Sequence, residues 1–239
     1  MVNLNRDVEI TYLGHATFKI QSPGGKTIII DPWVQGNPAC PDQLKKFDKI
    51  DIMAITHAHL DHIGDGVALG QEYKPKVVGI YETCAWINSK GIETIMPMNK
   101  GGTQDVDGIK FTMAHAVHSC GIQDDDGTII YGGEAAGYVF EFENGFKIYH
   151  AGDTAVFSDM KLIAEIYKPE LVMIPIGDLF TMSPKEASYA CRFLSPKYVI
   201  PMHYATFPVL TGTPAELREF TKDMKDMEII ELKPGEILT

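Results

Sequence analysis

A cluster of metal-binding residue types directly follows an apolar stretch of the chain. Residues 57–62 read His-Ala-His-Leu-Asp-His, and residues 50–56 before them are predicted to form a buried strand. Imidazole and carboxylate donors at this density suit zinc, manganese, iron or nickel, whereas calcium and magnesium prefer mostly oxygen ligands. The sequence therefore predicts a fold that places a metal site at the end of a strand.

The spacing within the cluster predicts two adjacent divalent ions. Side chains two positions apart on extended chain point the same way, so His57 and His59 can share one ion. Asp61 and His62, which follow a turn, can face a second ion. The alternative is that Asp61 only caps a helix and that the histidines are solvated. Three imidazole rings so close together would repel one another without an ion, and this favours the metal site.

The composition excludes several classes of protein. The chain has 239 residues, 45% of them hydrophobic, and no linker, so we predict a single domain spanning residues 1–239. Its net charge of -11 repels polyanions, so we expect a small-molecule substrate and no nucleic acid, and self-association into a homo-oligomer stays open. No apolar stretch approaches the ~20 residues that span a bilayer, and residues 1–7 lack the layout of a signal peptide, so a cytoplasmic protein is expected.

Strand-like runs separated by turn signals occur in both halves of the chain. We predict strands at residues 8–13, 17–21, 27–31, 50–56, 76–80, 109–117, 128–131, 138–142, 147–150, 171–175 and 198–201. Helices are predicted near His62 and at residues 158–167, 183–194 and 213–224, and the last two begin with Ser-Pro and Thr-Pro capping signals. Two sheets faced by helices make a layered α/β sandwich, in which loops at one edge of both sheets converge.

Further donors lie at the ends of later predicted strands. Asp153 follows the strand 147–150 and is a carboxylate that can bridge two ions, and His203 follows the strand 198–201 and can complete the second ion. The third histidine of the first ion is either His115 or His118. Alternation along residues 109–117 puts His115 on the same face as the apolar side chains there. This favours His118 as the ligand and His115 as a packed, hydrogen-bonded ring.

Other polar residues are predicted to surround the site. Asp31 can receive the second N–H of a ligand histidine, although an ordinary Asp-Pro turn explains it almost as well. His15, at a strand end, is a candidate catalytic proton donor or substrate contact, and its alternative is a buried polar residue with a backbone partner. His150 is predicted to support the ligands without binding an ion. One wall of the substrate pocket is expected to consist of Tyr204, Thr206 and Phe207.

Taken together, these motifs resemble the metallo-β-lactamase superfamily. The resemblance rests on the cluster at 57–62 and on Val-His-Ser at 117–119, Ala-Gly-Asp-Thr at 151–154 and Pro-Met-His at 201–203. Tyr-Leu-Gly-His-Ala-Thr at 12–17, Ile-Asp-Pro at 30–32 and Gly-Gly-Glu-Ala-Ala-Gly at 132–137 are similar to an uncharacterised metal-dependent hydrolase branch. That branch lies near L-ascorbate 6-phosphate lactonase. The resemblance implies a four-layer αβ/βα sandwich.

The resemblance also implies how the ligands divide between the ions. It assigns one ion to His57, His59 and His118, the other to Asp61, His62 and His203, and both to Asp153. It thereby selects His118 over His115. Asp153 argues against antibiotic hydrolysis, because true β-lactamases of the superfamily lack this aspartate. Histidine at position 59 disfavours the oxygen-reducing relatives, which carry glutamate there.

Hydrolysis is the chemistry expected from two such ions, of which zinc is the first choice. Water held between two cations has a pKa that falls toward ~7, so it supplies a hydroxide nucleophile at neutral pH. Asp61 is the catalytic residue expected to orient this hydroxide. The predicted substrate is a small ester, lactone or phosphodiester. The alternatives are a phosphodiesterase or nuclease of the same fold, and a non-catalytic sensor that binds its ligand through the metal ions.

Overall fold

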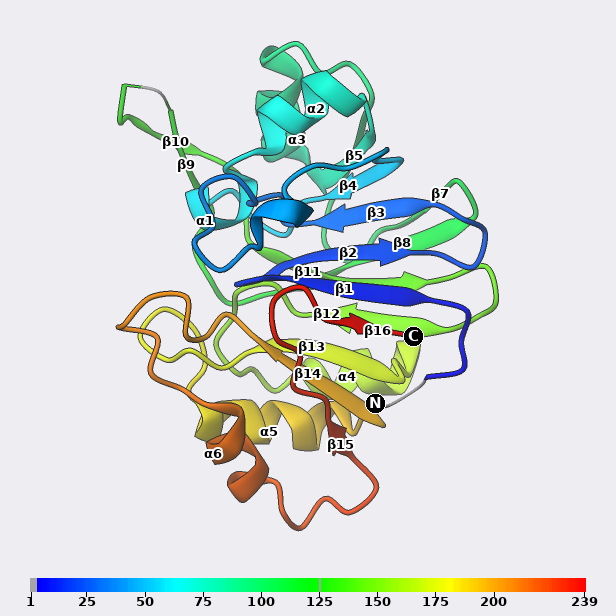
Figure 1. The fold of residues 1–239 in the computed structure, drawn as a ribbon, viewed down its shortest axis with the longest axis vertical. Coiled ribbons are helices and arrows are strands. Elements are labelled where there is room, and N and C mark those ends of the chain that lie inside the picture. The colour runs from blue at the N-terminus through cyan, green and yellow to red at the C-terminus, as the bar shows by residue number, and fades with distance from the viewer. Residues whose placement is uncertain (1–3, 125) are drawn as a thin grey trace.

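Two mixed β-sheets of seven strands each are formed by the described residues, 4–124 and 126–239, of the computed structural model (Figure 1). The first sheet has the strand order β16-β1-β2-β3-β4-β5-β6, and the second has the order β15-β14-β13-β12-β11-β8-β7. A separate two-stranded ribbon pairs β9 with β10. Of the polar N-terminal segment 1–7, the first three residues lie outside the described residues.

The strands are short and follow the chain in order. The first sheet contains β1 (Glu9–Gly14), β2 (Thr17–Gln21), β3 (Thr27–Ile30), β4 (Ile52–Ala54), β5 (Lys76–Ile80), β6 (Ile95–Met98) and β16 (Ile237–Leu238). The second contains β7 (Thr103–Val106), β8 (Ile109–His115), β11 (Ala136–Glu141), β12 (Lys147–His150), β13 (Leu171–Pro175), β14 (Tyr198–Met202) and β15 (Glu228–Ile229). The ribbon consists of β9 (Gly121–Gln123) and β10 (Ile129–Tyr131).

In Figure 1, α2 and α3 lie at one end of the molecule, and α5 and α6 lie at the other. The bounds of the helices are α1 (Leu60–Ile63), α2 (Gly66–Tyr73), α3 (Tyr81–Ser89), α4 (Met160–Tyr167), α5 (Pro184–Leu194) and α6 (Pro214–Phe220). Both α5 and α6 begin with the predicted capping box and a proline in the first turn. Within the described residues, no helix combines the length and the apolar character needed to cross a membrane.

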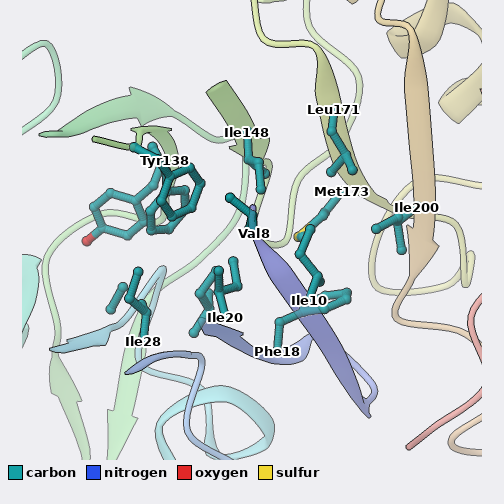
Figure 2. Close-up of a cluster of buried hydrophobic side chains, with 14 of the residues drawn as sticks. Val8, Ile10, Phe18, Ile20, Ile28, Tyr138, Ile148, Leu171, Met173 and Ile200 are labelled. Atoms are coloured by element: carbon teal, nitrogen blue, oxygen red, sulfur yellow. The ribbon is translucent and has the colours of Figure 1, made fainter. Parts of the chain in front are cut away.

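Alternation along the strands divides the apolar side chains among three core layers. Ile28 and Ile30 of β3 belong to the layer between the sheets, whereas Ile29 packs with the residues of α2 and α3. A third layer joins the second sheet to α4, α5 and α6. Figure 2 shows the central layer, in which side chains from both sheets, such as Phe18 and Ile200, lie together. The order of layers is helix, sheet, sheet, helix, and the predicted four-layer α/β sandwich is confirmed.

Strand direction positions the predicted site residues. Within the first sheet β1, β3 and β4 run in one direction, and within the second sheet β8, β12 and β14 share a direction. Each of these strands is followed, within about three residues, by one of His15, Asp31, His57, His118, Asp153 and His203. Strands of one direction end at the same edge of their sheet, where sites in α/β proteins are commonly found.

Some elements differ from the sequence prediction at their ends, and others were not predicted. β4 is shorter than the predicted 50–56, because the N–H of Thr56 leaves the sheet and donates to the Asp31 carboxylate. The helix predicted near His62 is two helices, α1 and α2, and the helix predicted at 213–224 ends at Phe220. The sequence did not predict α3, β6, β7, β9, β15 and β16. Of these, β15 and β16 are too short to show an alternating pattern.

Gly177, just after β13, lies against the backbone of His203, and this close approach yields a prediction. A Cβ atom at position 177 would overlap the His203 carbonyl oxygen, so we expect Gly177→Ala to cost about 1–3 kcal/mol of unfolding free energy. Thermal unfolding should show a melting temperature lower by roughly 2–4 °C per kcal/mol. Gly24→Ala is the matched control, since its Cβ would meet only the flexible end of Glu143. Equal melting temperatures for the two variants would contradict the prediction.

Candidate metal centre

Three histidine nitrogens converge in a first group. Nε2 of His57 lies 3.1 Å from Nδ1 of His59, and that Nδ1 lies 3.3 Å from Nε2 of His118. Zinc–nitrogen bonds of 2.0–2.1 Å in a tetrahedral site separate the nitrogens by about 3.3 Å, so the observed spacing fits ligands of one ion. The other nitrogens of His57 and His59 face the hydroxyls of Thr56, at 3.1 Å, and Ser119, at 3.2 Å.

A second group forms around the Asp153 carboxylate, which joins it to the first. Oδ2 of Asp153 lies 3.0 Å from Nε2 of His203 and 3.2 Å from Nε2 of His62. The same oxygen lies 3.7 Å and 3.8 Å from Nε2 of His118 and His57 in the first group. Asp61 completes the second group, with Oδ2 3.7 Å from Nε2 of His203. One carboxylate oxygen is thus shared by four imidazoles.

Several buried atoms of the second group have no hydrogen-bond partner among the described residues. They are Nε2 of His62, Oδ1 of Asp153 and both ring nitrogens of His203. The close nitrogen–oxygen contacts around Asp153 do not have the direction of hydrogen bonds. Buried polar atoms without partners are costly, and a bound cation would satisfy most of these. The donor set and the unsatisfied atoms therefore fit a metal centre.

The electrostatics of the two groups differ. Burial lowers the pKa of His57, His59 and His118, and the charge of His62 adds to this effect, so these imidazoles are neutral and keep a lone pair for a metal. In the second group burial again opposes the charged ring, yet the Asp153 carboxylate outweighs it and raises the pKa of His203 to about 9. The carboxylates therefore create a negative potential that favours a cation at this position.

Asp31 and Thr56 orient the ligands from behind. Oδ2 of Asp31 lies 2.8 Å from Nδ1 of His62, which can therefore donate to it and leave Nε2 directed at Asp153. Asp31 also accepts the N–H of Thr56 at 2.8 Å and its hydroxyl at 2.7 Å. The structure thus places Asp31 where the sequence prediction expected it, next to a predicted ligand. Its backbone also turns here, with a φ of 49°.

His15 lies beside Asp61 but is fully buried. Its Nε2 is 3.0 Å from Oδ2 of Asp61, and its Nδ1 is 3.0 Å from the hydroxyl of Thr206. A carboxylate only accepts, so Nε2 carries the proton, and burial lowers the pKa of the ring to about 4. His15 thus holds Asp61 in place, and its side chain is 0% exposed. Asp61 itself lies within α1 rather than at the cap, which is His59.

The remaining predicted residues lie around the centre at different distances. His150 is buried, and its Nδ1 accepts the N–H of Gly152, so it supports the turn that carries Asp153 instead of touching a ligand. His115 lies at the surface: its Nδ1 is 3.0 Å from Nζ of Lys100, and its ring stands edge-on to Phe157 with centroids 5.2 Å apart. The predicted hydrogen-bonded ring is therefore present, but on the exposed end of β8 and not within the apolar core. The structure brings His118, and not His115, into the cluster.

The predicted pocket residues separate into two locations. Tyr204 and Thr206 line a cavity of 280 Å³ that also touches His15, whereas Phe207 packs against Trp33. Trp33, Thr56 and Ser119 were missed by the sequence prediction. Each stands within two residues of a predicted site residue, and this proximity is the only signal that the sequence offered.

Comparison with known proteins identifies the family of the chain. The family described as Beta-lactamase superfamily domain matches residues 9–203. A UPF0173 metal-dependent hydrolase of Koribacter versatilis is 55% identical over 229 residues, which cover 96% of this chain and 97% of the relative. Another, from Solibacter usitatus, is 53% identical over 228 residues, with 95% and 98% covered.

A solved structure agrees with this result. Igni18, described as a novel metallo hydrolase from the hyperthermophilic archaeon Ignicoccus hospitalis, has a TM-score of 0.85 to this chain. The two sequences are 34% identical, and the match covers 97% of each chain. The chain therefore belongs to the UPF0173 metal-dependent hydrolase family of the metallo-β-lactamase superfamily.

Proposed function

We propose that the chain is a dinuclear metal-dependent hydrolase that acts on a small ester, lactone or phosphodiester, with cyclic esters the favoured class. The observation that carries the proposal is the position of Asp153, whose Oδ2 lies between two groups of nitrogen donors. His57, His59 and His118 would hold one ion, and Asp61, His62 and His203 the other. Zinc fits this donor set, and manganese, iron and nickel are alternatives. Such ions lower the pKa of water and polarise an attacked carbonyl or phosphoryl group.

Side chains of the protein supply the orientation that hydrolysis requires. The Asp61 carboxylate is 33% exposed, whereas that of Asp153 is 2% exposed, so Asp61 is the carboxylate that faces an incoming substrate. The N–H of His15 fixes one oxygen of Asp61, which keeps the carboxylate ionised and correctly placed to orient a water molecule. The pKa of Asp61 lies below its usual range: burial raises it, but the hydrogen bond from His15 and the nearby ring of His203 outweigh burial.

The first prediction from the proposed function concerns the reaction. Protein reconstituted with zinc, and separately with manganese, should hydrolyse members of a panel of small carboxylic esters, lactones and phosphodiesters. Asp61→Ala should lower the rate by at least about 100-fold, the scale of a general acid or base contribution, which also controls for contaminating activity. If bis(p-nitrophenyl) phosphate were the only substrate turned over, the protein would be a phosphodiesterase and not an esterase or lactonase. No turnover by fully loaded protein would point to a ligand sensor and overturn the proposal.

The second prediction concerns the ligands and uses two neighbouring histidines. We expect His118→Ala and Asp153→Ala to bind less metal than the natural sequence in elemental analysis after dialysis, because each removes a donor from the cluster. His115→Ala is the matched control, since this exposed ring lies outside the cluster and should leave the metal content unchanged. Full metal content in His118→Ala and in Asp153→Ala would show that the ligand assignment is wrong.

The third prediction concerns Asp31. Asp31→Asn replaces one of the two accepting oxygens with an NH2 group, which only donates. Either the Thr56 N–H at Oδ1, or the Thr56 hydroxyl and His62 at Oδ2, then face a donor, so the arrangement that orients His62 is disrupted. Affinity for the second ion should fall about 10–100-fold in a chelator competition assay. Asp51→Asn is the matched control, because Asp51 accepts a backbone N–H at the opposite end of β4. An unchanged affinity in Asp31→Asn would remove Asp31 from the metal centre.

A further inference from the structure

Two aromatic rings, which we call the aromatic corner, lie beside the metal centre. They belong to Trp33, from the loop after β3, and Phe207, from the loop after β14, and their centroids are 6.0 Å apart. Both rings pack against His15, at 5.2 Å for Trp33 and 5.9 Å for Phe207, and His15 in turn contacts Asp61. The corner is therefore one side chain away from the carboxylate that the proposed function places next to the substrate.

The corner remains open to solvent. Phe207 is 38% exposed and Trp33 is partly exposed, although both carry large apolar surfaces. Leu60, which lies between His59 and Asp61 in the chain, is 52% exposed. Exposed apolar side chains that gather beside a functional group mark a binding surface more often than scattered ones do. Among the described residues, the ion-pair partners of Asp61 and Asp153 are all histidines.

The Trp33 ring is held rigidly in its position. A Cβ atom at Gly36 would stand 2.8 Å from Nε1 of Trp33, and one at Gly64 would stand 2.9 Å from Cδ1, so both glycines make room for the ring. The loop itself is fixed by Asp65, whose carboxylate accepts the N–H groups of the two residues after Trp33 at 2.6 Å and 2.8 Å. A ring that is already ordered loses little entropy when a ligand packs on it.

We propose that Trp33 and Phe207 form a subsite for an aromatic group next to the scissile bond of the substrate. The proposal rests on the proposed hydrolase function, which it narrows to esters or lactones that carry an aryl group. Aromatic rings favour offset or edge-to-face contacts with centroids 4.5–7 Å apart, and two rings from different loops offer such contacts on two sides. Small aliphatic esters would bind the same metal centre without these contacts.

The test uses binding as well as turnover. Because the chain has two tryptophans, Trp86→Phe leaves Trp33 as the single fluorescent tryptophan. Metal-loaded Trp86→Phe protein is titrated with phenylacetate and with acetate, which present the same carboxylate. We expect phenylacetate to change the Trp33 emission and to bind about tenfold more tightly than acetate, as burial of a ring supplies at least the ~1.4 kcal/mol that tenfold requires.

Variants at the corner should remove this preference. Phe207→Ala, which changes an exposed residue, should bring the phenylacetate affinity at least about threefold closer to that of acetate, with metal content unchanged. Trp33→Phe lacks the fluorescent tryptophan, so its affinities are measured by titration calorimetry, and the same change is expected. Tyr189→Ala, an exposed aromatic residue on α5, is the matched control and should keep the preference. Kinetics follow the same order: kcat/KM for methyl phenylacetate or benzyl acetate should fall more in the corner variants than kcat/KM for methyl acetate does.

The outcomes separate the two proposals. Equal affinities for phenylacetate and acetate, or a preference that survives in Phe207→Ala, would overturn the subsite even if esters are hydrolysed. Selective binding of phenylacetate without turnover of any ester would uphold the subsite and overturn the hydrolase. A change of oligomeric state in Phe207→Ala, with ligand affinities unchanged, would show that the corner binds a second copy of the chain and would also overturn the subsite.

Discussion

The apolar layer between the two sheets determines where the metal-binding residues meet. Side chains such as Phe18 and Ile200 exclude water from this layer and hold the sheets face to face. At the functional edge, the backbone N–H of His203 donates to the carbonyl of His15, and that of Ala136 donates to Thr56, so the two sheets are also joined by hydrogen bonds. The donors of the second group, around Asp153, come from both sheets, and their distances therefore depend on this contact.

The metal centre buries polar atoms, whereas the core buries apolar side chains. Asp153 and the imidazoles around it are buried, and several of their polar atoms have no partner among the described residues. Burying such atoms costs free energy that apolar packing must offset until a cation compensates them. Asp31, Thr56 and Ser119 reduce the cost by engaging the far side of the ligand rings. The fold thus fixes the geometry of the cluster, and a bound metal ion would compensate its buried polar and charged atoms.

Most residues of this site could be predicted from the sequence, because many metal-binding residue types occur close together and because they follow regular strands. Side chains two apart on extended chain explained why His57 and His59 act together, and the strand ends pointed to Asp153 and His203. The sequence did not predict the hydroxyl partners of His57 and His59, because a hydroxyl next to a histidine has no distinctive spacing. It did not reveal that His115 lies at the surface, because local alternation does not show that β8 ends at that residue. Trp33 was missed because its relation to Phe207 exists only in the tertiary structure.

The glycines beneath Trp33 have a consequence for how substrate choice can evolve. A methyl group at Gly36 would first meet the indole of Trp33, whereas one at Gly64 would overlap the backbone oxygen of Leu60. Under the proposed aromatic subsite, a substitution at Gly36 is therefore a route by which the ring position, and with it the choice of substrate, can change. A substitution at Gly64 would instead disturb α1, the helix that carries Asp61 and His62.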